Sequence, residues 1–176
     1  MDSERSRSQP LAEVPLERRV YAFAIDFAAV ALLAGAAAIP LLQVLVFAAA
    51  WLGLRVYAVL RYRGQSLGRW AFNLKVIDGR RGTLPDSGIL LQREGLTGVG
   101  ALLAAIGLTQ LPNPIGFGIP CIPLAADLLF AFASEQRGQT FHDSYTRTTI
   151  VWAERGYSLD ERLKRWVDEA RNRLGR

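Results

Sequence analysis

Long apolar stretches alternate with charged segments along this chain. Residues 20–60 and residues 96–133 carry only three charged side chains, those of Asp26, Arg55 and Asp127, although the chain has 21 Lys and Arg and 16 Asp and Glu residues. A soluble core does not need stretches this long with so few charges. The pattern therefore predicts an integral membrane protein.

Four membrane helices, arranged as two hairpins, are expected from these stretches. A helix needs about 20 apolar residues to cross the hydrocarbon core, and Pro40 divides the first stretch into two segments of that length. The segment LPNPIGFGIP divides the second stretch, because its prolines disrupt helical hydrogen bonding. The predicted helices are residues 20–39, 41–60, 96–111 and 115–133.

Lys and Arg residues lie on one side of this arrangement. Four precede the first helix, seven lie between the second and third helices, nine follow the fourth, and none lies in the connections near Pro40 and Asn113. Because Lys and Arg accumulate on the cytoplasmic side, we expect a multi-pass protein of an inner (or other energy-transducing) membrane with both termini cytoplasmic. The third helix is short and could cross with tilt or only re-enter the bilayer, so three spans is the alternative.

Composition excludes several kinds of site. Cys121 is the only cysteine and there is one histidine, so neither a disulfide within the chain nor a cysteine or histidine-cluster metal site is possible. We expect no metal and no cofactor. The net charge of +5 does not require nucleic acid as a partner, because basic loops beside membrane helices already account for it.

Two short β-strands are predicted outside the membrane helices. Residues 74–77 alternate in polarity before an Asp-Gly turn, and residues 146–152 are rich in β-branched side chains. They follow similar sequences, RGQSL at 63–67 and RGQTF at 137–141. We expect 74–77 to pair with 148–151 on the cytoplasmic side, as parts of two repeated hairpin-plus-strand halves. A coincidental match, or independent use of Gly-Gln where a helix stops, is the alternative.

The C-terminal segment is predicted to form an amphipathic helix over residues 158–174. Ser158 and Glu161 fit a capping box, and the apolar side chains lie on one stripe. Such a helix packs on the membrane domain or on a partner, or it lies on anionic lipid headgroups. The expected organisation is a polar tail at 1–17, a membrane domain at 18–152 and this helix within 153–176.

Three short motifs resemble the RDD family of small polytopic membrane proteins. RVYAFAID at 19–26 is similar to the family's opening, in which an arginine precedes the first helix and an aspartate follows seven residues later. GQSLGR at 64–69 and GQTFHD at 138–143 are similar to its two later motifs. The resemblance covers about residues 18–152. It assigns the family's motif positions to Arg19, Asp26, Gly64, Ser66, Gly68, His142 and Asp143.

This resemblance implies a membrane protein and leaves its activity open. Transport of unknown ligands has been suggested for the family, and some members look like cation/proton antiporters. Four short helices enclose little lumen. We therefore expect a non-catalytic accessory or assembly subunit of a larger membrane complex, and as the alternative a small ion or solute transporter that works as an oligomer.

The three charges within the apolar stretches are the main candidate site. Asp26, Arg55 and Asp127 each lie six to eight residues from the charged cytoplasmic end of their helix, or roughly 9–12 Å deep at about 1.5 Å per residue. Charged side chains at such depth usually have a partner or a function. We expect the three to meet in direct or water-bridged contact, either as a structural ion network or as a site where one carboxylate binds a proton or cation.

His142 and Asp143 do not predict an enzyme. A His-Asp pair without a serine or cysteine nucleophile in a convincing setting is a weak signal for catalysis. We expect no catalytic residue, and we expect Asp143 to orient nearby backbone and to pair with Arg19 or Arg69.

Overall fold

Helices make up most of the part of the chain that the computed structural model describes, which is residues 14–133 and 139–153. The first hairpin contains α1 (Leu16–Gly35) and a second helix built from α2 (Pro40–Leu52), a π-helical turn (Gly53–Tyr57) and α3 (Ala58–Arg61). The middle of the chain forms α4 (Leu67–Ala71) and β1 (Leu74–Asp78). The remaining elements are α5 (Ser87–Leu108), α6 (Pro114–Ala133), α7 (Phe141–Thr146) and β2 (Thr148–Trp152).

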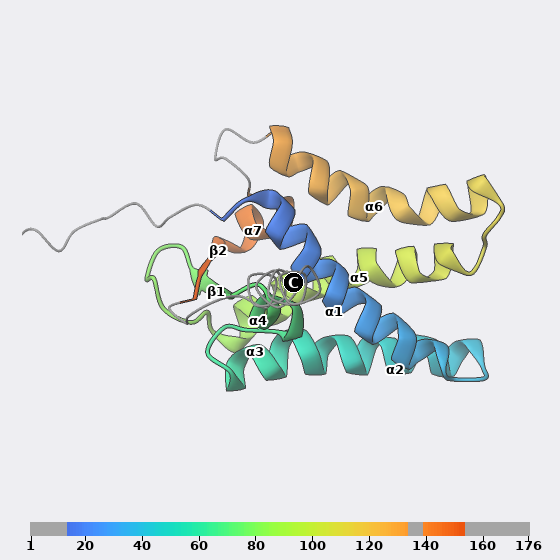
Figure 1. Cartoon of the computed structure of the whole chain (residues 1–176), viewed down its shortest axis with the longest axis horizontal. Coiled ribbons are helices and arrows are strands. Elements are labelled where there is room, and N and C mark those ends of the chain that lie inside the picture. Colours follow the sequence, from blue (N-terminus) through green and yellow to red (C-terminus); the bar gives the residue numbers. More distant parts are fainter. Residues whose placement is uncertain (1–13, 134–138, 154–176) are drawn as a thin grey trace, which may run out of the picture.

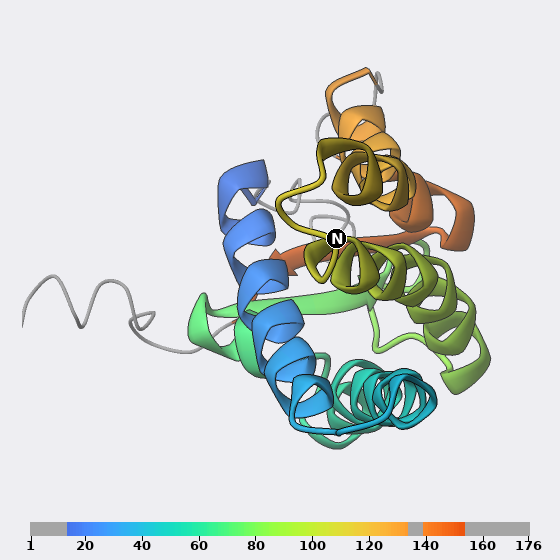
Figure 2. The ribbon, with the colours of Figure 1, turned by 90° about the vertical axis from the view of Figure 1, so that its right-hand side faces the viewer.

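The long helices run lengthwise, and the short elements gather at one end (Figure 1). The turns of the α1–α2 and α5–α6 hairpins lie at the opposite end. Viewed from that end, α5 lies between α2 and α6, and α1 lies beside α2 (Figure 2). The predicted two-hairpin arrangement therefore matches the order of these helices, while the short elements form a layer at one end of them.

Among the described residues, three helices are long and apolar enough to cross a membrane: Pro40–Arg61, Ser87–Leu108 and Pro114–Ala133. The helix α1 is not among them, because Glu17, Arg18, Arg19 and Asp26 lie within its 20 residues. The prediction of four spanning helices is thus supported for three of them by length and composition.

The third helix differs most from its prediction. It begins at Ser87 and has 22 residues, whereas the sequence predicted a short element at 96–111. Arg93 and Glu94, which the prediction leaves in the loop before residue 96, lie inside the helix and are fully buried. Ion pairs with other buried residues compensate their charges, and α5 is long enough to cross a membrane.

A π-helical turn keeps one face of the second helix directed inward. Phe47, Trp51, Arg55 and Val59 are buried and spaced by four residues. In a regular α-helix such positions drift by about 40° at each step. The wider turn at Gly53–Tyr57 counters this drift, so that Arg55 and Val59 continue the inward face of Phe47 and Trp51.

The two predicted strands pair as expected. Strands β1 and β2 form an antiparallel two-stranded sheet in which Leu74 pairs with Trp152 and Asp78 with Thr148. The second strand begins two residues later than predicted, because residues up to Thr146 belong to α7. Arg147 then adopts a left-handed conformation with φ of 54°, which redirects the chain into β2.

Residues 1–13 of the predicted polar tail at 1–17, and the predicted C-terminal helix at 158–174, lie outside the described residues.

Candidate functional site

Asp26 is the most deeply buried acidic side chain of α1. Its carboxylate accepts hydrogen bonds from Ser66 Oγ at 2.6 Å, Gly68 N at 2.7 Å and Arg55 Nη1 at 2.8 Å. These donors belong to the start of α4 and to the π-helical turn. One carboxylate therefore holds α1 to the second helix and to the layer of short elements.

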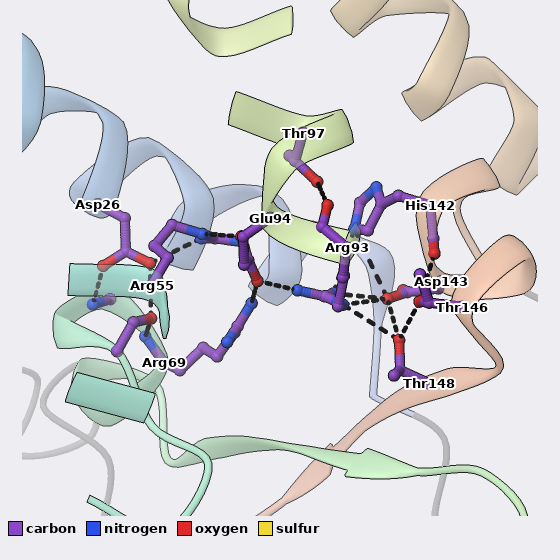
Figure 3. Close-up of polar contacts among 12 residues, drawn as sticks. Asp26, Arg55, Arg69, Arg93, Glu94, Thr97, His142, Asp143, Thr146 and Thr148 are labelled. Atoms are coloured by element: carbon purple, nitrogen blue, oxygen red, sulfur yellow. Dashed lines mark hydrogen bonds and ion pairs between the residues drawn. The ribbon is translucent and has the colours of Figure 1, made fainter. Parts of the chain in front are cut away.

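Glu94 forms the centre of a buried ion network (Figure 3). Its two carboxylate oxygens accept from Arg55 Nε at 2.6 Å, from Arg69 Nη2 at 2.8 Å and from Arg93 Nη1. All four side chains are buried. Arg55 also lies over the rings of Phe23 and Trp51, within 5.5 Å of each ring centroid, a distance at which cation–π attraction is significant.

Arg93 extends the network to α7 and β2. Its Nη2 donates to Asp143 Oδ1 at 2.5 Å, and its Nε lies 3.1 Å from both Asp143 Oδ1 and Thr148 Oγ1. Arg19 Nη1 lies 3.8 Å from Asp143 Oδ2. Asp143 therefore pairs with Arg19, as expected, but its shortest contacts are with Arg93, which was not predicted as a partner.

Asp127 makes no direct contact with Arg55, so the direct contact predicted for this part of the cluster is wrong. Its carboxylate accepts the backbone amide of His142 at 3.0 Å and contacts His142 Nδ1 at 2.7 Å. Arg55 is instead held by Asp26 and Glu94. The prediction relied on equal depth alone, whereas α7 folds back to place His142 beside α6 and Glu94 occupies the position next to Arg55.

The contacts of His142 assign its neutral tautomer. Its Nε2 lies 3.1 Å from Arg93 Nη2, and an arginine can only donate. Nε2 therefore accepts this bond, and the ring proton of the neutral form is on Nδ1, where it donates to Asp127. Through this ring the Asp127 carboxylate is connected to the rest of the network.

Opposite charges balance within the described part of this region. Four arginines (Arg19, Arg55, Arg69 and Arg93) accompany four carboxylates (Asp26, Glu94, Asp127 and Asp143). Outside the membrane helices, burial and the guanidiniums of Arg55 and Arg93 lower the pKa of Arg69 to about 10, so it stays protonated at neutral pH. Burial raises the pKa of the Asp143 carboxyl, but the charge and hydrogen bond of Arg93, together with the other nearby positive groups, hold this pKa well below its usual range.

A cavity of about 330 Å³ adjoins the network. Side chains of α1 and α6, including Val20, Phe23, Leu124 and Leu128, form apolar walls. The charged and polar lining residues are Arg19, Arg55, Arg69, Arg93, Thr97, Asp127, Thr140, His142 and Asp143. The arrangement can therefore surround a small molecule with an apolar wall on one side and fixed charges on the other.

A comparison with protein families decides the family. The model of the RDD family matches residues 14–147, which is most of the chain. The chain belongs to the RDD family. Comparisons with curated proteins and with solved structures found no match.

The motif positions assigned by the RDD resemblance lie in or next to the network. Arg19, Asp26 and Asp143 all contribute charges to it. Ser66 caps α4 by accepting from Arg69 N at 3.4 Å while it donates to Asp26. The RDD motifs, which are far apart in sequence, are thus brought together by the fold.

Two of the RDD motif glycines are required by close approach of the backbone. A Cβ at Gly68 would lie 1.9 Å from the carbonyl oxygen of Ala22 on α1. A Cβ at Gly64 would lie 2.7 Å from the carbonyl oxygen of Val76, and Gly64 has φ of +94°. Both positions therefore allow the segment around α4 to pack against other backbone without a side chain between them.

Sequence reasoning missed Arg69, Arg93 and Glu94 as members of the candidate site. The sequence prediction places Arg93 and Glu94 in the loop before the third helix at 96–111. The sequence signal that could have identified Arg93 and Glu94 is Asp86-Ser87, where α5 begins. A helix that begins there contains both residues about two turns from its start. Within residues 14–133 and 139–153, no group of three or more His, Cys, Asp or Glu side chains is placed to hold a metal ion.

Proposed function

We propose that this RDD-family membrane protein acts as a non-catalytic accessory or assembly subunit of a larger membrane complex. The observation that carries the proposal is the buried ion network, in which Asp26 and Glu94 are fully buried and held by arginines from three elements. Buried charges held this way fix the position of helices. Such a network supports a structural role better than a reactive one.

The helix α6 is the proposed partner-binding face. Of its 20 residues only Ala131 is buried, and it carries exposed apolar side chains such as Ile119, Ile122 and Phe132. Lipid alone can cover such a surface, but another membrane helix can also pack against it. We propose that α6 packs against a helix of the partner complex or of a second copy.

Photo-crosslinking in the native membrane tests this function. A photoreactive amino acid at Ile122 on α6 should give a discrete crosslinked protein product that is identified by mass spectrometry after mild-detergent purification. The matched control places the same amino acid at Leu32, an exposed position on α1. The proposal would be contradicted if the photoreactive amino acid at Ile122 crosslinked to lipid alone and no protein co-purified.

We further propose the membrane arrangement: α1 crosses together with the three apolar helices, and both termini lie in the cytoplasm of an inner membrane. The distribution of Lys and Arg supports this orientation. With α1 crossing, the layer formed by α4, β1, α7 and β2 lies on the cytoplasmic side.

A second candidate function is ion- or proton-coupled transport by an oligomer. One observation favours it: Asp127 and His142 form a hydrogen-bonded pair that lines the cavity, and the Asp127 side chain keeps 18% of its exposure. Asp127→Asn should then abolish coupled flux in proteoliposomes while the protein still folds. An unmutated protein without flux in the same vesicles would remove this candidate.

A further inference from the structure

We propose that the cavity between α1 and α6 binds the phosphate headgroup of an anionic phospholipid, with its acyl chain against the apolar wall. This site is independent of the accessory role proposed above. Its volume of about 330 Å³ is at the lower end of the range of about 300–1,000 Å³ for small-molecule pockets. It is therefore large enough for a headgroup and the first part of a chain.

Guanidinium groups outnumber carboxylate groups in the lining of the cavity. Four guanidiniums line it, those of Arg19, Arg55, Arg69 and Arg93, but only two carboxylates do, those of Asp127 and Asp143. The other two carboxylates of the network, Asp26 and Glu94, are not part of the lining. Asp26 and Glu94 compensate part of this charge from behind the lining, but the surface that faces the cavity presents two more guanidiniums than carboxylates, which favours an anion.

Arg69 supplies a second and independent sign of a ligand. Its side chain is buried, with 1% of its surface exposed, and it lines the cavity. Its Nη2 is used by Glu94, but its Nη1 has no hydrogen-bond partner among the described residues. A buried donor without a partner costs free energy. The acceptors that a guanidinium binds best are the oxygens of phosphate and carboxylate groups.

The other end of the cavity fits a hydrocarbon chain. Its wall contains Val20 and Phe23 from α1 and Leu124, Ala125 and Leu128 from α6. Val20 and Phe23 lie in the first half of α1, and the three α6 residues lie in the second half of α6. A lipid of the adjacent leaflet can place its headgroup at the arginines and its chain between α1 and α6.

Lipid titration followed by native mass spectrometry tests the site. The full-length protein is purified in detergent, depleted of lipid, and titrated with phosphatidylglycerol, with phosphatidylcholine and with inorganic phosphate. We expect one tightly bound phosphatidylglycerol and at least about tenfold weaker binding of phosphatidylcholine. Equal binding of the two lipids would overturn the anionic site, and binding of inorganic phosphate as tight as that of phosphatidylglycerol would overturn its assignment to a lipid.

Two neighbouring alanines on α6 locate the lipid. Ala125 lines the cavity and Ala126 does not, although both are exposed. Ala125→Phe should weaken phosphatidylglycerol binding by about tenfold or more, and Ala126→Phe should leave it within about twofold. Equal effects of the two substitutions would place the lipid elsewhere and refute the proposal.

Substitution of the arginine tests the headgroup contact. Arg69→Gln should weaken phosphatidylglycerol binding, whereas Arg81→Gln, on the exposed turn after β1, should not. If Arg69→Gln fails to fold, the two alanine variants still decide the proposal, because neither residue belongs to the ion network. A folded Arg69→Gln protein that binds phosphatidylglycerol normally would overturn it.

Discussion

Gly68 donates its backbone amide to the Asp26 carboxylate at 2.7 Å, across 42 residues of sequence. An equivalent bond occurs in the second half of the chain, where His142 donates its amide to Asp127 at 3.0 Å. Gly68 and His142 each follow a Ser or Thr by two residues, in the similar sequences GQSLG and GQTFH. In both halves, a carboxylate from a long helix thus holds the start of a short helix that leads into a strand.

The close approach at Gly68 gives the first prediction. Gly68→Ala should destabilise the fold by about 1–3 kcal/mol or more, because the new Cβ would lie 1.9 Å from the carbonyl oxygen of Ala22. Thermal unfolding of the detergent-solubilised protein measures the effect. The control is Gly95→Ala on α5, where nothing lies within 4 Å of the added Cβ. An unchanged midpoint in Gly68→Ala would show that α1 and α4 are not packed this closely.

The central position of Glu94 gives the second prediction. Glu94→Gln removes the charge that compensates Arg55, Arg69 and Arg93, so it should cost about 3–5 kcal/mol of folding free energy. Glu17→Gln, at an exposed position of α1, should have little effect. Chemical unfolding in detergent provides the comparison.

The double variant separates network energetics from other effects of Glu94→Gln. Adding Arg69→Met removes one of the stranded charges, so Glu94→Gln with Arg69→Met should be more stable than the sum of the two single effects implies. Simple additivity would mean that Glu94 and Arg69 do not interact in the folded protein.

The sequence predicted the arrangement of the elements better than the partners of the buried charges. Apolar length and proline positions predicted the two hairpins, and β-branched residues predicted the strands that pair as β1 and β2. Periodicity along a chain does not report which side chains meet across helices. Identifying Glu94 as the second partner of Arg55 therefore required knowledge of where α5 begins, because the prediction placed Glu94 in a loop.

The error over Asp127 has a related physical cause. Equal depth in the membrane places charges at the same level, but it does not determine the direction of each side chain around its helix. Asp26 and Arg55 were matched correctly because α1 and α2 form a hairpin and pack directly. Asp127 lies on α6, where the backbone and ring of His142 provide nearer donors.

The pKa of Asp143 gives the third prediction. This pKa is held below its usual range in the folded protein, so the unfolded state binds more protons when the pH falls through the ordinary aspartate range, near about 4. The stability contributed by Asp143 is therefore present at neutral pH and decreases as the pH falls below about 5. Unfolding midpoints measured between pH 7 and the acid limit of the detergent system should show this decrease.

Asp143→Asn should reduce the pH dependence because its side chain does not titrate. Its stability at neutral pH should be lower, and its curve should be flatter than that of the unmutated protein in acid. Asp86→Asn, at an exposed position where Arg81 lies 3.3 Å away, is the matched control and should keep the original slope. The same acid slope in Asp143→Asn and the unmutated protein would assign the pH dependence to other carboxylates.

The last prediction concerns the orientation in the membrane. In a Cys121→Ala background, Asn113→Cys places a thiol in the exposed turn between α5 and α6, and Arg81→Cys places one in the turn after β1, at the opposite end of the molecule. Because Lys and Arg surround the second position and are absent from the first connection, the inside should be at Arg81. A membrane-impermeant maleimide added to intact cells should label Asn113→Cys and label Arg81→Cys only after permeabilisation. The reverse pattern would invert the topology and place the layer of α4, β1, α7 and β2 outside the cytoplasm. Labelling of both thiols in intact cells would show that the two ends of the molecule do not lie on opposite sides of the bilayer.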